Sequence, residues 1–271
     1  MIQREVNAAV MFNCYEFTFN GESSYQYGLM VYDIGGVGQR DVSFGNRAEI
    51  VETRTSGRIR PIHFGVKYHE DPLEFQLVFG AEQALDRYEL ERVSYWLTGH
   101  QDYKWLSIGQ PDLEKLQFRC MVTELTPISH GWLPVAFQAT IRCDCPYAYS
   151  FPFRNQYTIS GETGILLRND SSVREWIRPE LTFVPAAGTS ELVLVNADDG
   201  DRQFRLSGIP EGVTVTVDND TGIITTAPTE HNLYGGFDLQ FFRLVSGDNH
   251  IKATGDGTLT ISGRFLYNTA G

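Results

Sequence analysis

The amino-acid sequence predicts a mainly β protein with two domains and one α-helix. Apolar and polar residues alternate along many short stretches, such as VAFQATIRC at residues 135–143, and a period of two is typical of strands with one buried face. One stretch, residues 81–97, instead spaces its apolar residues about three and four apart, as an amphipathic helix requires. At 271 residues the chain is long for one domain and sufficient for two.

The helix of the first domain is predicted over residues 81–97. Tyr88, Val93 and Trp96 fall on the face that we expect to be buried. Acidic residues lie toward the N-terminal end, where the helix dipole favours them, and Gly99 ends the pattern. The remainder of the first domain, expected to span residues 1–147, is predicted to be strands and loops.

Residues 35–61 differ from the rest of the first domain because glycine and polar residues dominate. Such a segment forms either a long protruding hairpin, a belt, or a disordered loop. Ile50, Val51 and Ile59 favour strand pairing and therefore the hairpin. The arginines of this segment are Arg40, Arg47, Arg54, Arg58 and Arg60.

The second domain is expected to span residues 148–271. Pro146 interrupts the alternation that precedes it, because proline cannot donate a hydrogen bond to a sheet. Turn sequences such as NADDGD, DNDTG and SGDN then recur between short alternating stretches. Several short strands separated by such turns are typical of a β-sandwich.

Four cysteines do not form a disulfide framework, and we expect the thiols to stay reduced. Cys143 and Cys145 would lie about 6.5–7 Å apart on a strand, at the outer limit for a disulfide. A zinc site needs two further ligands, and only the distant Cys14 and Cys120 remain. Cys120 and Cys143 are in phase with buried positions, so both are interpreted as core residues. No catalytic, cofactor or metal site is predicted.

The formal net charge of −12 reflects an excess of acidic residues in both halves of the chain. A surface of this sign repels phosphates, so no specific nucleic-acid binding is expected, although DNA could slide past it. The sequence has no run of about 18 apolar residues, and its first residues lack the apolar stretch of a signal peptide. No membrane association is predicted.

Aromatic residues in the second half raise the question of sugar binding. Trp176 and Tyr234 lie near turns and are the candidate glycan contacts, with ordinary packing as the alternative. A glycoside hydrolase is a weaker alternative, because its two carboxylates are set by a spatial separation that a sequence does not show, and the chain offers no motif for such an enzyme. We predict that the protein is not an enzyme.

Two stretches of the first half resemble the distal tail protein (Dit) family of long-tailed bacteriophages, chiefly those of Gram-positive hosts. FTFNGESSYQYGLMVYDI at residues 17–34 has the strand, polar turn and Tyr-Gly-Leu with which that family typically opens. Cys143, Pro146 and Tyr147 fit the strand end that closes its N-terminal domain, although Cys145 stands where Pro or Asp is more usual.

A third stretch extends the resemblance to nearly the whole chain. Leu244, Gly247 and Asn249 form a Leu-x-x-Gly-x-Asn turn, followed by an alternating strand and a final aromatic pair. The resemblance implies a structural protein of the virion, assembled in the host cytoplasm. It also implies a β-sandwich-like N-terminal ring domain with one helix and a belt, and a galectin-like C-terminal β-sandwich.

The resemblance further implies a homo-hexameric ring. Such rings join the tail tube protein to a tail-associated lysin or hub protein, carry receptor-binding proteins in some assemblies, and leave a lumen for DNA. A ring needs an interface that closes on itself, and the arginines of residues 35–61 are the expected contacts with acids of a neighbouring copy. The alternative function is a carbohydrate-binding module that recognises host cell-wall polymer.

Overall fold

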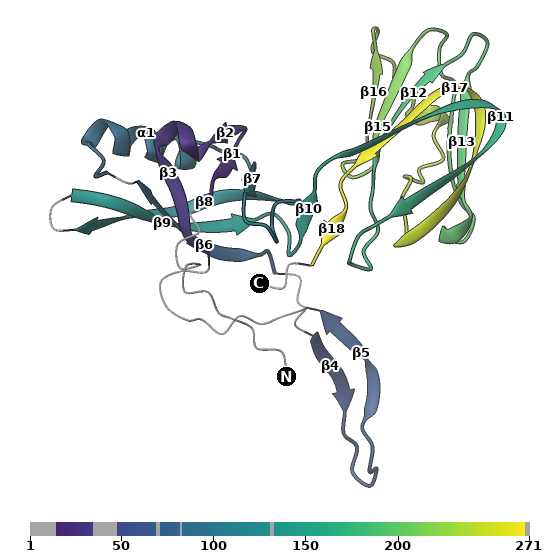
Figure 1. Ribbon diagram of the computed structural model, residues 1–271. Coiled ribbons are helices and arrows are strands. Elements are labelled where there is room, and N and C mark those ends of the chain that lie inside the picture. The colour runs from purple at the N-terminus through teal and green to yellow at the C-terminus, as the bar shows by residue number, and fades with distance from the viewer. Residues whose placement is uncertain (1–14, 35–47, 69–70, 82, 131–132, 269–271) are drawn as a thin grey trace, which may run out of the picture. The chain divides into compact units, whose positions relative to one another are not determined.

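The chain forms two compact units, each with its own hydrophobic core (Figure 1). The N-terminal domain ends at Tyr149, and the C-terminal domain comprises Ser150–Tyr267. The computed structural model describes residues 15–34, 48–68, 71–81, 83–130 and 133–268.

One antiparallel sheet makes up most of the N-terminal domain. Its long central strands β8 and β9 alternate buried and solvent-facing side chains, as the sequence pattern predicts. The short β10 (Ala148–Ser150) pairs with β8 where the domain ends. In spatial order the sheet contains β2 (Glu22–Ser23), β1 (Phe17–Phe19), β7 (Lys104–Ile108), β8 (Leu116–His130), β9 (Leu133–Cys143), β6 (Glu74–Ala81) and β3 (Leu29–Ile34).

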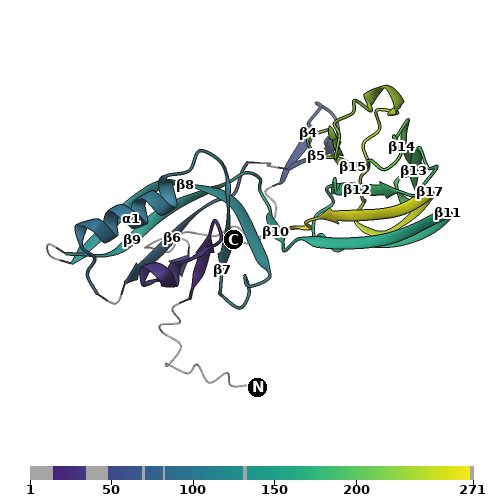
Figure 2. The ribbon, with the colours of Figure 1, turned by 90° about the horizontal axis from the view of Figure 1, so that it is seen from above.

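Helix α1 (Arg87–Thr98) lies on one face of this sheet (Figures 1 and 2). Val93, Trp96 and Leu97 are buried together with side chains of the sheet. Trp96 also donates a hydrogen bond from Nε1 to the backbone oxygen of Phe19, at 3.2 Å. This buried contact fixes α1 against the end of β1.

The helix begins later than the sequence pattern predicts. Ala81 is not helical; it ends β6 and pairs with Leu29. The first helical residue is Arg87, because Asp86 caps the helix: its carboxylate accepts a hydrogen bond from the Glu89 amide, and the Glu89 side chain accepts one from the Asp86 amide, both at 2.8 Å. The predicted start at residue 81 is therefore wrong, whereas the predicted end at Gly99 is correct.

The C-terminal domain is built almost entirely from antiparallel strands. In spatial order its strands are β14 (Arg202–Ser207), β13 (Glu191–Asn196), β17 (Gly247–Gly263), β12 (Glu180–Pro185), β15 (Thr214–Asp218) and β16 (Ile223–Ala227), with β11 (Phe153–Asn169) along the other side of β17. Single turns of 3₁₀ helix occur at η3 (Ala197–Asp199) and η4 (Tyr234–Gly236), and β18 (Leu266–Tyr267) follows β17.

A bend in β17 lets this one strand serve two sets of neighbours. Residues 251–254 pair with β13, and residues 257–262 pair with β12. Gly255 and Gly257 lie at the change and have φ near +145°, a conformation that side chains disfavour. The sheet curls around a core that includes Phe183, Phe204 and Leu259, as in a sandwich or half-barrel.

The fold-class prediction is confirmed: the protein is mainly β with one α-helix in the described residues. The N-terminal domain also includes the short η2 (Ser24–Tyr27) and a separate two-stranded sheet of β4 (Ala48–Thr53) and β5 (Ile62–Tyr68). Within the parts of the chain that the structure covers, no helix is both long and apolar enough to cross a membrane.

Candidate functional site: the β4–β5 hairpin

Strands β4 and β5 pair only with each other among the described strands. The register shifts between Val51 and Glu52, so Phe64 is an extra residue on β5 and forms a β-bulge. An isolated two-stranded hairpin is marginally stable in water, and its unpaired strand edges can template pairing with another chain. Within the described residues, the hairpin therefore presents two unpaired strand edges.

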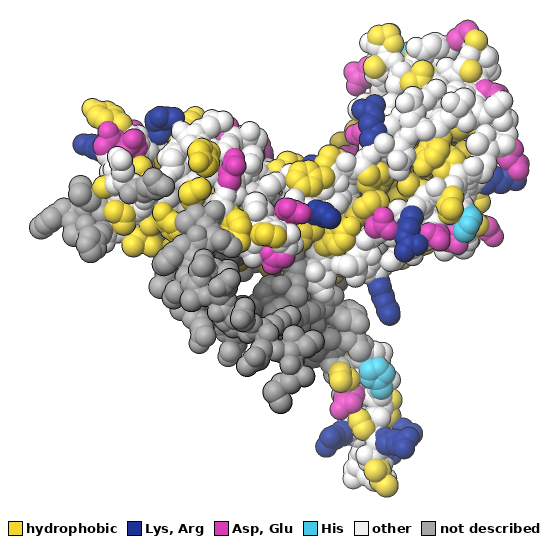
Figure 3. Space-filling view, viewed as in Figure 1, with side chains coloured by type: hydrophobic (Ala, Val, Ile, Leu, Met, Phe, Trp, Pro, Cys, Tyr) yellow, Lys and Arg dark blue, Asp and Glu magenta, His cyan; other side chains and the backbone are white. Residues whose placement is uncertain are grey.

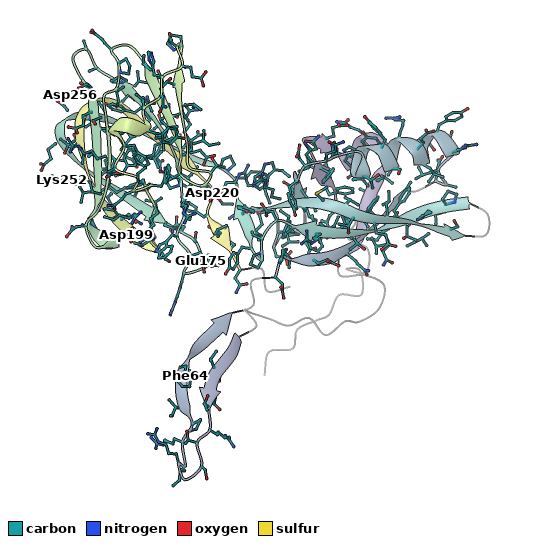
Figure 4. All side chains as sticks on the ribbon, turned by 180° about the vertical axis from the view of Figure 1, so that it is seen from behind. Phe64, Glu175, Asp199, Asp220, Lys252 and Asp256 are labelled. Carbon is teal, nitrogen blue, oxygen red and sulfur yellow. The ribbon has the colours of Figure 1, made fainter. Side chains whose placement is uncertain are left out.

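The hairpin also exposes several apolar side chains, although exposed apolar surface lowers the solubility of a protein. Ile59 is fully exposed, and Phe64, labelled in Figure 4, is exposed over two-thirds of its surface. Ile50 and Val51 of β4 are exposed as well. Figure 3 shows hydrophobic and basic side chains on the surface of the hairpin. Contiguous exposed apolar groups mark sites of protein interaction.

Residues 54–60, the hairpin tip, carry three of the arginines that the sequence singled out. Arg54, Arg58 and Arg60 are all exposed, and none of them takes part in a salt bridge among the described residues. The tip turns where the Arg58 amide donates to the Thr55 carbonyl at 3.1 Å, with Gly57 at φ 86°. Arg40 and Arg47 lie outside the described residues.

A second surface, which the sequence did not predict, is a groove of about 560 Å³ beside α1. We call it the α1 groove. Tyr88, expected on the buried face of the helix, is 77% exposed there, because it shares one side of α1 with the exposed Tyr95 and not with the buried Val93. The residues that line the α1 groove are Glu22, Tyr27, Tyr88, Glu91, Arg92, Tyr95, Trp96 and His100.

Comparison with protein-family models gives two matches that together cover most of the chain. Residues 12–145 match a model described as a phage tail protein N-terminal domain, and residues 147–263 match a phage tail C-terminal domain. The chain belongs to this phage tail protein family. The resemblance to tail proteins that the sequence motifs indicated is thus confirmed.

Individual relatives of this tail protein are distant in sequence but similar in length. The SPbeta prophage-derived uncharacterized protein YomH of Bacillus subtilis (strain 168) is 24% identical over 253 residues, covering 93% of this chain and 97% of YomH. The crystal structure of SPP1 Dit (gp 19.1) matches with a TM-score of 0.66 and 13% identity, over 93% of this chain and 99% of that one.

A chain in the structure of the phage P2 baseplate, in its activated conformation with Ca, matches with a TM-score of 0.53 and 10% identity. The match covers 92% of this chain and 97% of the baseplate chain. At these identities the two solved structures establish a shared fold. The tail protein thus has the Dit fold over nearly its whole length.

The candidate glycan contacts of this tail protein have other partners in the structure. The Arg243 guanidinium lies 3.8 Å from the centroid of the Trp176 ring, and Arg243 is itself bound by both carboxylate oxygens of Asp199, at 2.7 and 2.9 Å. Arg243 therefore covers one ring face of Trp176, although Trp176 remains half exposed. Asp199 is labelled in Figure 4.

Tyr234 serves the turn between β15 and β16. Its hydroxyl accepts a hydrogen bond from the Ile224 amide at 3.0 Å and donates one to the Gly222 carbonyl at 3.1 Å. The hydroxyl thus both donates and accepts a hydrogen bond within the domain.

The cysteines occupy apolar or hydrogen-bonded surroundings. Cys120 and Cys143 are fully buried, as the strand phase predicted. Burial raises the pKa of the Cys143 thiol to about 12, so this thiol stays protonated at neutral pH. The Cys145 thiol donates to the Tyr147 carbonyl at 3.3 Å, and its sulfur also lies 3.3 Å from the Tyr149 hydroxyl oxygen. A protonated thiol is a poor nucleophile and a poor metal ligand.

Proposed function

We propose that this phage tail protein is a structural component of the tail tip that forms a hexameric ring. The observation that carries the proposal is the β4–β5 hairpin. Among the described residues its strand edges are unpaired, its tip arginines form no salt bridge, and Ile59 and Phe64 are exposed. The whole-length match to SPP1 Dit, described as a paradigm of the hub adsorption apparatus in Gram-positive infecting phages, supports the same role.

In this role the ring links the tail tube protein to a tail-associated hub or lysin protein, and receptor-binding proteins attach around it. The N-terminal domain, proposed to span residues 1–147, forms the wall of the ring, and the C-terminal domain, residues 148–271, decorates it. The net charge of −12 suits a lumen through which DNA moves, because like charges prevent the phosphates from sticking. The protein acts as a virion component, assembled in the host cytoplasm, without catalysis.

Negative-stain microscopy and mass photometry of the purified protein test the proposal. We expect rings of six copies in the intact chain and monomers when residues 48–68 are replaced by a short Gly-Ser linker. Circular dichroism should show that both domains of the shortened chain remain folded. A monomer at every concentration of the intact chain would overturn the ring, and a ring that survives the replacement would overturn the role of the hairpin.

The alternative function, binding of host cell-wall polymer through Trp176 and Tyr234, stays a prediction. Trp176 is half exposed, and Arg243 lies over one face of its ring. Glycan-array binding by the full chain, lost in Trp176→Ala, would support it. Equal signals from the two chains would exclude Trp176 as a glycan contact.

A further inference from the structure

The floor of the α1 groove is built from aromatic side chains that are already fixed in place. The Tyr27 ring lies flat on Trp96, with centroids 4.3 Å apart and an interplanar angle of 9°. The Tyr27 hydroxyl donates to the Glu22 carboxylate at 2.8 Å, and the Arg92 guanidinium lies 5.3 Å from the centroid of the Tyr27 ring. A floor held in this way loses little conformational entropy when a ligand binds.

Two tyrosines of α1 line the same groove with their rings largely in solvent. Tyr88 and Tyr95 are each 77% exposed. They are seven residues apart, close to two helical turns, so they share one side of the helix at a separation of about 10 Å along its axis. Exposed aromatic rings at a fixed spacing can each stack on one unit of a repeating ligand.

The side chains between the two tyrosines are charged rather than apolar. Glu91 and Arg92 lie between them on the same side of α1, and both are exposed and line the groove. Carboxylates are depleted from the centres of protein–protein interfaces, because a protein partner has to desolvate them. A carboxylate in the middle of an aromatic surface therefore favours a ligand that brings hydrogen-bonding groups of its own.

Sugar rings combine the two surfaces that such a groove requires. One face of a pyranose carries C–H groups that pack on an aromatic ring, and its edge carries hydroxyls. Because a hydroxyl both donates and accepts, it can donate to the Glu91 carboxylate and accept from the Arg92 guanidinium. The groove volume of about 560 Å³ also lies within the range of about 300–1,000 Å³ that is typical of small-ligand sites.

The spacing of the tyrosines selects among sugar chains. In an extended β-1,4-linked chain each ring is turned over relative to the next, so alternate rings present the same face. The distance between such alternate rings is close to the separation of Tyr88 and Tyr95 along α1. An α-1,4-linked chain coils instead, and its alternate rings do not line up on a straight helix.

We propose that the α1 groove binds an extended β-1,4-linked polysaccharide. Alternate sugar rings stack on Tyr88 and Tyr95, and the hydroxyls of the ring between them bind Glu91 and Arg92. The site belongs to the N-terminal domain and is distinct from the candidate glycan contacts of the C-terminal domain. It gives the tail protein a contact with a glycan chain that does not depend on ring formation.

Isothermal titration calorimetry of the full chain tests the proposal with chitotetraose, a β-1,4-linked tetrasaccharide of N-acetylglucosamine. We expect binding of chitotetraose and of cellotetraose, which has the same linkage, and no binding of the α-1,4-linked maltotetraose. The disaccharide chitobiose reaches only one of the two tyrosines. We therefore expect it to bind about fivefold more weakly than chitotetraose, or weaker still.

Variants locate the site on α1. Tyr88→Ala and Tyr95→Ala should each lower the affinity for chitotetraose about fivefold or more, whereas Tyr88→Phe keeps the ring and should bind like the natural chain. Glu91→Gln should also weaken binding, because a charged acceptor forms the stronger hydrogen bond. Tyr25→Ala is the matched control: Tyr25 is 67% exposed but does not line the groove, so its loss should leave the affinity unchanged. Circular dichroism checks that each variant is folded.

Three results would overturn the proposal. They are the absence of chitotetraose binding to the natural chain, equal affinities for chitotetraose and maltotetraose, and binding that persists when Tyr88 and Tyr95 are both replaced by alanine. If the natural chain binds no sugar and this double variant no longer assembles, the groove belongs to a protein partner instead. Failure of the natural chain to form rings would overturn the proposed function and leave the glycan site standing.

Discussion

Cys120 on β8 and Cys143 on β9 lie directly opposite each other in the antiparallel register. The next pair along, Arg119 and Asp144, is joined by a hydrogen bond from the Asp144 amide to the Arg119 carbonyl at 2.9 Å. Because hydrogen-bonded and non-hydrogen-bonded pairs alternate, Cys120 and Cys143 occupy a non-hydrogen-bonded position, where facing side chains are closest. Two buried thiols therefore fill one small space at the centre of the N-terminal sheet.

The first prediction concerns the pH dependence of the N-terminal domain. Burial raises the pKa of Cys143 from 9.0 to about 12, and burial also raises that of Cys120. Well below pH 9.0 the thiols are protonated in both the folded and the unfolded chain. At higher pH the unfolded chain releases protons that the folded chain keeps, so the free energy of unfolding should fall as the pH rises toward 12.

Urea unfolding from neutral pH to about pH 10 measures this effect. Cys143→Ala is the matched control, because it keeps a small apolar side chain and removes the titrating group. We expect a smaller pH slope in the control than in the natural chain, whatever its stability at neutral pH. Identical slopes in the two chains would contradict the burial of an un-ionised thiol.

The second prediction concerns the start of α1. Asp86→Ala removes the carboxylate that accepts a hydrogen bond from the Glu89 amide. The helix thereby loses its N-terminal cap. We expect the N-terminal domain to lose about 1 kcal/mol of stability, measured as a lower urea midpoint. Arg87→Ala, one residue further on and exposed, should change the midpoint little. If both variants behave alike, the cap is not what fixes the helix start.

The third prediction concerns Asn249, the last residue of the Leu-x-x-Gly-x-Asn turn. The side chain is fully buried, accepts from the Val245 amide at 2.9 Å and from Asn196 Nδ2 at 2.8 Å, and donates to the Val245 and Gly247 carbonyls at 2.9 and 3.0 Å. The side chain thus closes its own turn and ties it to the end of β13.

Asn249→Leu keeps the size of this side chain but leaves several buried polar groups without partners. We expect the C-terminal domain to lose about 3 kcal/mol, seen in its thermal transition. Asn232→Ala is the control: its side chain accepts one hydrogen bond, from the Tyr234 amide at 3.1 Å, and should cost about 1 kcal/mol. A loss no larger than in the control would mean that the turn holds without Asn249.

The features that the sequence predicts correctly are those that depend on the local alternation of apolar and polar residues. Alternation identified the buried faces of β8 and β9, and with them Cys120 and Cys143. The predicted start of α1 is too early because the helical spacing of apolar residues extends back to Ala81. In the structure Ala81 instead pairs with Leu29 of β3 as the last residue of strand β6. Pattern alone does not reveal such competition between a helix and a sheet.

The α1 groove could not be predicted from the sequence for a different reason. Glu22 and Tyr27 come from the segment around η2, and Tyr88, Arg92 and Trp96 come from α1, so the surface exists only after packing brings the two together. The stack of Tyr27 on Trp96 has no signature in the sequence. The hairpin was visible as an unusual composition, but its strand β5 continues to Tyr68, past the expected limit at residue 61.

The last prediction concerns the hairpin tip. Arg54, Arg58 and Arg60 are exposed and form no salt bridge within the described residues, so replacing all three by alanine should leave the fold of the N-terminal domain unchanged. Assembly should weaken, because the cations that meet the acids of the next copy are gone. Since exposed charges are screened over about 10 Å at about 0.1 M salt, assembly of the natural chain should also weaken as salt rises.

Mass photometry at low and high salt compares the natural chain, the triple alanine variant and Arg168→Ala. Arg168 is an exposed arginine of the C-terminal domain that is already paired with Asp170 and Asp248, so its loss should leave assembly unchanged. The triple variant should assemble poorly at low salt and show little further loss at high salt, because its salt-sensitive contacts are already absent. If the triple variant and the natural chain assemble equally at low salt, the strand edges and Ile59, rather than the arginines, stabilise the contact between the hairpin and the next copy.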